Sequence, residues 1–212
     1  MGYSMLRAED VKFDVTIIGF HGTLLEKAKK IIADKKFEFS EYRKDHWLGQ
    51  GIYFFREDYH QAKAWALTKV KRQKENGAIL KTILKVDKSS VLNLDARDDL
   101  IFFTEFKKEF VKYCTENKIK LSADPNVFRC TICDELPQEI KVIQRTFPGE
   151  GYFNGDLKEI DLVLHGVQVC VRDKSLIDFK QTNICGVVNY IPPIVSKNTK
   201  KRRKKRIFSN KE

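Results

Sequence analysis

The spacing of apolar residues predicts strands and helices in the first half of the chain. A strand is predicted over residues 14–20 (DVTIIGF), because this run is rich in β-branched residues, and it ends in a tight turn at His21-Gly22. A helix is expected to follow at once, with Thr23 as its cap and Glu26 completing a capping box. The apolar face of this helix consists of Leu24, Ala28, Ile31 and Ile32.

The same patterns predict the next elements. Asp58 is placed to cap a second helix. One side of that helix carries Ala62, Trp65, Ala66 and Val70. Strands are predicted at residues 51–55 and 78–86, and short strands at 37–39 and 91–94. Residues 40–50 are polar and are predicted to form a loop.

The second half of the chain is richer in strands than in helices. A third amphipathic helix is marked by Leu100, Phe103, Phe106, Phe110 and Cys114. Residues 117–139 show no regular pattern, and further strands are predicted at 160–164, 167–171 and 176–179. Because consecutive strand–helix–strand alternation is absent, we expect an α+β fold with a split, mostly antiparallel sheet and flanking helices. We expect one domain over residues 10–190 and a basic tail over 191–212.

The net charge of +11 changes the picture, because it indicates an anionic partner such as nucleic acid, an anionic membrane or a nucleotide. Seven consecutive basic residues, Lys200 to Arg206, supply most of the excess, and without them the formal charge falls to +4. Such a run attracts phosphates without sequence preference. A nuclear localisation signal and a solvated end are the other interpretations.

The cysteines and the hydropathy indicate a cytoplasmic protein. Five cysteines, an odd number without framework-like spacing, favour a reducing compartment. Cys130 and Cys133 form a C-x-x-C pair, but no second pair of ligands follows, so no metal is expected. No apolar run is long enough for a transmembrane segment, and no secretory signal is visible.

Three residues in these elements are candidates for binding or catalysis. His21 can donate or accept a hydrogen bond at neutral pH, and Gly22 lets a ligand approach the backbone closely. A histidine at this position is also typical of a turn or of a protein core. Tyr53 projects on the face opposite its two neighbours, where it stacks on a flat heterocycle or packs as an ordinary strand residue. Gln168 lies between apolar neighbours and is either exposed or satisfied in a pocket.

The combination of these pieces resembles a known family. The matching pieces are HGT, a following helix, FEFS, LGQGIYF and a helix containing AKAWA. In this order they resemble the donor-site half of the poly(ADP-ribose) polymerase and diphtheria-toxin group of ADP-ribosyltransferases. The match is close over residues 19–66 and loose over 160–171.

The resemblance implies NAD as co-substrate and assigns roles to individual residues. His21 would bond the adenine-proximal ribose, Tyr53 would stack on nicotinamide, and the backbone of Gly22 would pair with the carboxamide. Thr23 and Gly51 belong to the same implied cofactor site. Arg43 and Lys44, in the loop before it, either meet the pyrophosphate or are ordinary solvated charges.

The third residue of the family is usually a glutamate on a late strand, and Gln168 stands at the best matching position. A neutral amide can hold a ribose hydroxyl, but it lacks the charge that stabilises an oxocarbenium-like transition state. The resemblance therefore implies transfer of a single ADP-ribose rather than polymer formation. Alternatively, Glu150 or Glu159 supplies the charge.

We therefore expect a mono-ADP-ribosyltransferase that modifies a macromolecule, with RNA or DNA slightly favoured over protein. Small transferases of this kind include toxin and antiphage effectors, so the resemblance also implies a neutralising antitoxin protein. The alternative is a catalytically silent module that binds NAD or ADP-ribose and acts as a nucleic-acid-binding adaptor. A third hypothesis is an unrelated basic binding domain in which the HGT and GIYF motifs occur by chance.

Overall fold

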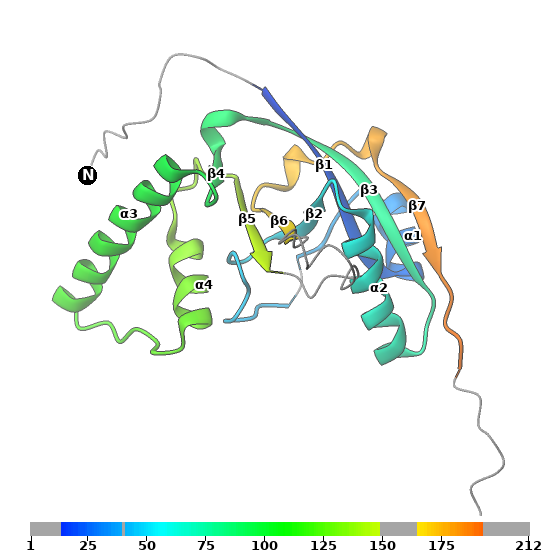
Figure 1. Ribbon diagram of the computed structural model, residues 1–212, viewed down its shortest axis with the longest axis horizontal. Helices are drawn as coiled ribbons and strands as arrows, with labels where there is room; N and C mark the ends of the chain where they lie inside the picture. The colour runs from blue at the N-terminus through cyan, green and yellow to red at the C-terminus, as the bar shows by residue number, and fades with distance from the viewer. Residues whose placement is uncertain (1–13, 40, 149–164, 193–212) are drawn as a thin grey trace, which may run out of the picture.

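The computed structural model describes residues 14–39, 41–148 and 165–192. In these ranges the chain forms an α+β fold with a seven-stranded sheet in the order β4-β5-β6-β2-β1-β3-β7 (Figure 1). The strands are β1 (Asp14–Leu24), β2 (Ile52–Arg56), β3 (Gly77–Asp87), β4 (Val91–Asn93), β5 (Val142–Pro148), β6 (His165–Val171) and β7 (Asn183–Val188). The helices are α1 (Leu25–Asp34), α2 (Tyr59–Gln73), α3 (Arg97–Glu116) and α4 (Pro125–Glu135). The pairing is antiparallel except between β4 and β5, which confirms the predicted α+β class and mostly antiparallel sheet.

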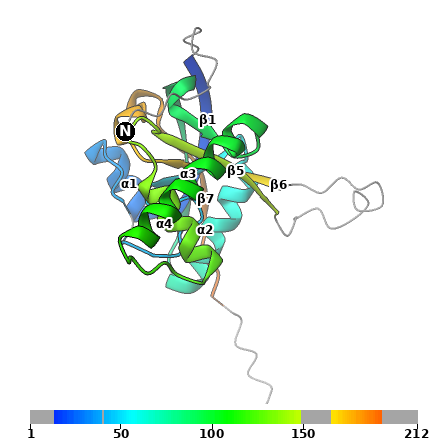
Figure 2. The same cartoon turned by 90° about the vertical axis from the view of Figure 1, so that its left-hand side faces the viewer.

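Buried apolar side chains form three clusters, each named here after the helix that contributes to it. The α1 cluster includes Ile17, Ala28, Phe54 and Leu80; the α2 cluster includes Ala62, Ala66 and Ile79; the α4 cluster includes Leu48, Cys133 and Cys170. Ile79 and Leu80 are consecutive in β3, so the α1 and α2 clusters lie on opposite faces of the sheet. Cys170 alternates with Val169 of the α1 cluster, so the α4 cluster shares a face with the α2 cluster. Figure 2 shows the fold turned by 90°.

The first strand is longer than its sequence pattern predicts. It pairs with β3 without interruption from Asp14↔Asp87 to Leu24↔Gly77, so the predicted tight turn at His21-Gly22 is wrong. The capping prediction is wrong as well. Helix α1 begins at Leu25 with no side-chain cap, because Thr23 is a buried strand residue opposite Ala78.

Other local predictions divide into confirmed and wrong ones. The Asp58 carboxylate accepts from the Gln61 amide and caps α2 as predicted, whereas Trp65 is 49% exposed and does not share the buried side of that helix. Residues 37–39 form no strand. The predicted strand at 176–179 is replaced by two short 3-10 turns.

Three elements, α4, β5 and β7, appear where no regular structure was predicted. Helix α4 lies within the irregular stretch 117–139, capped by the Asp124 carboxylate and led by Pro125. Strand β5 pairs with both β4 and β6. Glu150, Glu159, the predicted strand at 160–164 and residues 193–212 of the basic tail lie outside the described residues. None of the helices in the described ranges is long and apolar enough to span a membrane.

Candidate functional site

The three residues singled out from the sequence lie on three neighbouring strands. His21 is on β1, Tyr53 on β2 and Gln168 on β6, and these strands are adjacent in the order β6-β2-β1. Tyr53 is directly opposite Cys170 of β6, and Gln168 is two residues before Cys170. Tyr53 and Gln168 therefore share one face of the sheet.

Strands β1 and β2 separate close to these residues. Their pairing is limited to Gly19↔Arg56 and Phe20↔Phe55, although both strands continue beyond that point. The Ile18 carbonyl accepts from the Glu57 amide at 2.9 Å, so Ile18 points its backbone groups toward β2. Backbone direction alternates along a strand, so the N–H and C=O of Gly22 point the same way. At Gly22, however, the described part of β2 provides no strand partner.

His21 bridges the two strands with its side chain. Its Nδ1 lies 2.7 Å from the Tyr53 carbonyl oxygen, and its ring packs edge-on against Phe37 and Phe54. Burial, reinforced by the charge of Lys69, lowers the pKa of His21 to about 4. The imidazole is therefore neutral at pH 7. Since a carbonyl only accepts, Nδ1 carries the proton and Nε2 is the acceptor atom.

Tyr53 closes the loop that precedes its own strand. Its hydroxyl donates to the Gly49 carbonyl at 2.7 Å and accepts from the Leu48 amide at 2.8 Å. The ring packs on the α4 cluster and lies edge-on to His46. Burial raises the pKa of the phenol far above its usual range, so the hydroxyl stays neutral. The side chains of Tyr53 and His21 lie on opposite faces of the sheet, so a ligand that contacts both must lie across the separated strand ends.

We expect Tyr53→Phe to lower the free energy of unfolding by about 1–2 kcal/mol, because it removes a hydroxyl that makes two hydrogen bonds inside the fold. The ring, and with it any stacking on a bound heterocycle, is retained. Urea unfolding measures the loss. The matched control is Tyr113→Phe on α3, where the tyrosine is 56% exposed and the expected change is near zero. Equal stability of the two variants would show that the loop closure contributes nothing.

The glycines of the two motifs are required by packing. A Cβ on Gly22 would overlap the Ala62 carbonyl of α2, and one on Gly51 would overlap the Cys170 sulfur of β6. The sequence suggested that Gly22 clears space for a ligand. The structure gives another reason, because packing against α2 already requires a glycine at this position. What remains available to a ligand at Gly22 is its backbone edge on the β2 side.

Lys69 was not singled out from the sequence, but it reaches this edge. Its Nζ donates to the Gly22 carbonyl at 3.0 Å. Burial, together with the charges of Lys27 and Arg72, lowers the pKa of Lys69 to about 8. The only sequence signal is helical spacing, which places Lys69 seven residues after Ala62, on the side of α2 that packs against β1.

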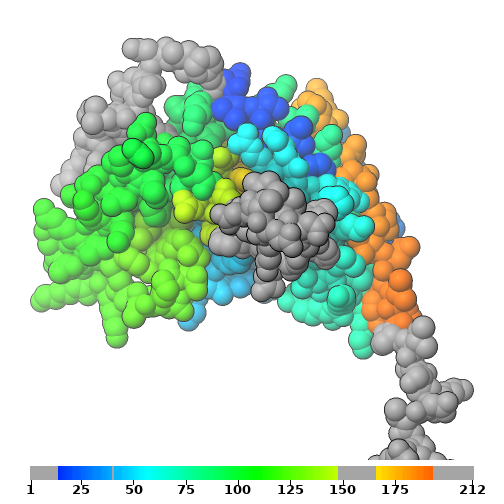
Figure 3. Space-filling view, in the orientation of Figure 1, coloured from blue at the N-terminus to red at the C-terminus, as the bar shows by residue number. Residues whose placement is uncertain are grey.

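The remaining residues predicted for the site are Arg43 and Gln168. The Arg43 guanidinium is 59% exposed and forms a two-point ion pair with Asp45, while its carbonyl accepts from the Gln50 side chain. Gln168 is half-buried and lies between Phe55 of β2 and Arg145 of β5. In the space-filling view of Figure 3, α3 and α4 form the left part of the visible face, and α2 lies in its right part.

Cys130 and Cys133 are both buried on α4. Burial raises the pKa of Cys133 to about 12, so this thiol is a poor nucleophile at neutral pH. The Cys130 thiol lies within hydrogen-bonding distance of the Arg43 carbonyl and of the Asp134 carboxylate. Among the described residues, no group of three or more His, Cys, Asp or Glu is placed to hold a metal ion.

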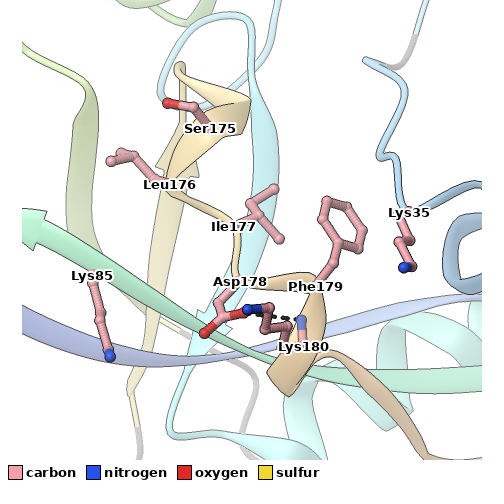
Figure 4. A pocket seen from close by; sticks show the side chains of 8 residues that line it. All are labelled: Lys35, Lys85, Ser175, Leu176, Ile177, Asp178, Phe179 and Lys180. Atoms are coloured by element: carbon pink, nitrogen blue, oxygen red, sulfur yellow. Dashed lines mark hydrogen bonds between the residues drawn. The ribbon is translucent and has the colours of Figure 1, made fainter.

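An open depression of about 580 Å³ lies beside the two 3-10 turns. Its lining includes Ile177 and Phe179 together with Lys35, Lys85 and Lys180 (Figure 4). It includes neither His21 nor Tyr53. Phe179 in its lining packs against Phe37, which in turn contacts His21, so the depression borders the α1 cluster.

Comparisons with known proteins give one relative. No protein-family model and no solved structure matches the chain. Among curated proteins, the chain is similar to the uncharacterized protein MJ0359 of Methanocaldococcus jannaschii, at 33% identity over 87 residues. The matched part is 40% of this chain, and the chain spans only 40% of the length of that relative. The name of that relative assigns no activity.

Proposed function

We propose that this chain is a mono-ADP-ribosyltransferase that binds NAD where β1 and β2 separate. The observation that supports this most strongly is the order β6-β2-β1, which brings the strands of His21, Tyr53 and Gln168 together. These residues are far apart in the sequence, and the resemblance to ADP-ribosyltransferases requires them in one site. On this proposal the sheet is the split sheet of that family.

The residues present suit the roles proposed for them. The Nε2 of neutral His21 is an acceptor, as a ribose hydroxyl requires. The backbone edge of Gly22 faces the gap in which β2 no longer pairs with β1, and a carboxamide pairs with such an edge. Tyr53 offers a partly exposed ring for stacking.

The proposed reaction breaks the glycosidic bond between the ribose and nicotinamide. The bonding electrons leave with the nicotinamide nitrogen, and the cationic ribose is attacked by an acceptor nucleophile that loses a proton. Positioning supplies most of the catalysis. Gln168 holds a ribose hydroxyl but adds no negative charge, so a single ADP-ribose is transferred rather than a polymer.

The proposed acceptor is nucleic acid, RNA or DNA, in preference to protein. The net charge of +11 favours an acceptor rich in phosphate, and the charge is still +4 without the seven basic residues at Lys200 to Arg206. Modification of nucleic acid is harmful to a cell. We therefore propose a toxin or antiphage role with a neutralising protein partner.

A silent binding module is the second candidate, and two observations favour it. Gln168 lacks the carboxylate, and the Gly22 carbonyl already accepts a hydrogen bond from Lys69. In this case the chain binds NAD or ADP-ribose without cleaving it and acts as an adaptor on nucleic acid.

The deciding experiment incubates the purified chain with NAD labelled in the adenylate phosphate and with separate pools of RNA, DNA and protein. We expect label in a nucleic-acid pool and a loss of about tenfold or more in Gln168→Ala, because the amide positions the ribose. The matched control is Gln138→Ala, which removes an exposed amide before β5. Label found only in the protein pool would show that the acceptor is protein and not nucleic acid. NAD binding without label in any pool would select the silent module, and absence of NAD binding would reject both.

A further inference from the structure

Lys69 is a cation without an anionic partner in the described structure. Its Nζ is bound to a neutral carbonyl, that of Gly22, and it forms no ion pair with a described carboxylate. The side chain is half-buried, so its ammonium has lost part of its hydration. A partly desolvated charge of this kind is stabilised by an opposite charge.

The charged groups around Lys69 are also cations. Lys27, in the first turn of α1, and Arg72, in the last turn of α2, both repel the Lys69 ammonium, and Lys69 in turn disfavours the charged form of His21. Neither Lys27 nor Arg72 is paired with a described carboxylate. Lys27 lies in the first turn of α1, where the helix dipole is also positive, and the first amide of this helix, that of Leu25, donates to the Asn76 carbonyl.

We propose that Lys69, supported by Lys27 and Arg72, binds the diphosphate of a dinucleotide beside His21 and Gly22. This inference rests on the proposed binding of NAD, in which His21 holds a ribose. A ribose and its diphosphate are joined through a single carbon, so their binding groups must lie close together. Lys69 meets this condition although it comes from the opposite face of the sheet to the His21 ring, because it contacts the Gly22 carbonyl in the gap between β1 and β2 and its charge acts on His21. An ammonium binds phosphate oxygens as a point charge.

The test measures binding of ADP-ribose, adenosine and inorganic pyrophosphate by calorimetry. For Lys69→Met, we expect ADP-ribose and pyrophosphate to bind about tenfold or more weakly, since a charge-assisted hydrogen bond is lost. Adenosine, which has no phosphate, is expected to bind equally to both proteins. Lys69→Arg keeps the charge and is expected to recover part of the affinity. The matched control is Lys63→Met, which removes an exposed lysine of the same helix and is expected to bind like the wild type.

The dependence on pH separates a charge from a packing role. The pKa of Lys69 in the free protein is about 8, so ADP-ribose affinity is expected to fall as the pH rises above 8. Lys69→Arg removes this fall, because arginine stays charged. The charges that act on Lys69 are those of Lys27 and Arg72, and His21, with a pKa of about 4, remains neutral in this range.

The outcomes separate this inference from the proposed function. Transfer of label from NAD together with ADP-ribose affinity unchanged in Lys69→Met would overturn the diphosphate site and leave the transferase standing. Lys69-dependent binding of ADP-ribose and pyrophosphate without any transfer would support the site and reject only the transferase. An oligonucleotide without terminal phosphates is the last probe. If its affinity alone depends on Lys69, the site binds the acceptor backbone and the dinucleotide assignment is overturned.

Discussion

His21→Asn is expected to lower the rate of ADP-ribose transfer by about 100-fold while leaving the fold intact, because a misplaced ribose is attacked inefficiently. The asparagine side-chain nitrogen takes the place of Nδ1 and can still donate to the Tyr53 carbonyl, which the histidine contacts at 2.7 Å. Nothing replaces Nε2, so the acceptor for the ribose hydroxyl is lost. Initial rates with labelled NAD measure the effect, and thermal unfolding checks the fold.

Two further variants make this result specific. His21→Gln places an amide near the position of Nε2 and is expected to retain more activity than His21→Asn. The matched control is His60→Asn, which changes an exposed histidine at the start of α2 and is expected to transfer at the wild-type rate. A stable His21→Asn protein with full activity would remove Nε2 from the proposed mechanism.

Gly22→Ala is expected to be the most damaging small substitution in the site, with a loss of about 3 kcal/mol or more in the free energy of unfolding. The new Cβ would overlap the Ala62 carbonyl and lie 2.8 Å from the Ala66 amide nitrogen. Both are backbone atoms of α2, so only a shift of the whole helix can relieve the overlap. Urea unfolding of the variant measures the loss.

Gly166→Ala is the matched control for this substitution. A Cβ at Gly166 would meet only the side chain of Gln61, at 3.4 Å, which is close to ordinary contact. We expect a change of less than about 1 kcal/mol. If Gly22→Ala were as stable as Gly166→Ala, α2 would not lie against β1 as described. Because Gly22→Ala is expected to displace α2, a loss of NAD binding in this variant is explained by the altered fold and does not test a ligand contact.

Elements determined by nearby residues were predicted well. The α2 cap at Asp58 was confirmed, and α3 extends over Arg97–Glu116 as its repeating phenylalanines indicate. Helix α4 was missed although Asp124-Pro125 is a recognisable start signal, because its surroundings lack a regular apolar repeat. Strands β5 and β7 were missed because their pairing partners are distant in the sequence.

The candidate site shows the same division. The motifs around His21 and Tyr53 are local and visible in the sequence, and the expected roles of these residues follow from the family resemblance. The hydrogen bond between His21 and Tyr53 joins residues 32 positions apart, and the contact of Lys69 with Gly22 joins residues 47 apart. Neither distance has a signature in a local pattern.

The sequence by itself determined the class of the fold, several of its helices and strands, and the chemical types of the candidate residues, because these depend on neighbours along the chain. Only the tertiary structure decided that β1 passes straight through His21 and Gly22, since β3 pairs along its whole length. It also decided that β2 leaves β1 at Phe20, so that the Gly22 carbonyl has no strand partner on that side and accepts from Lys69. The physical reason is that strand pairing and helix packing join distant segments, and local patterns carry no information about their partners.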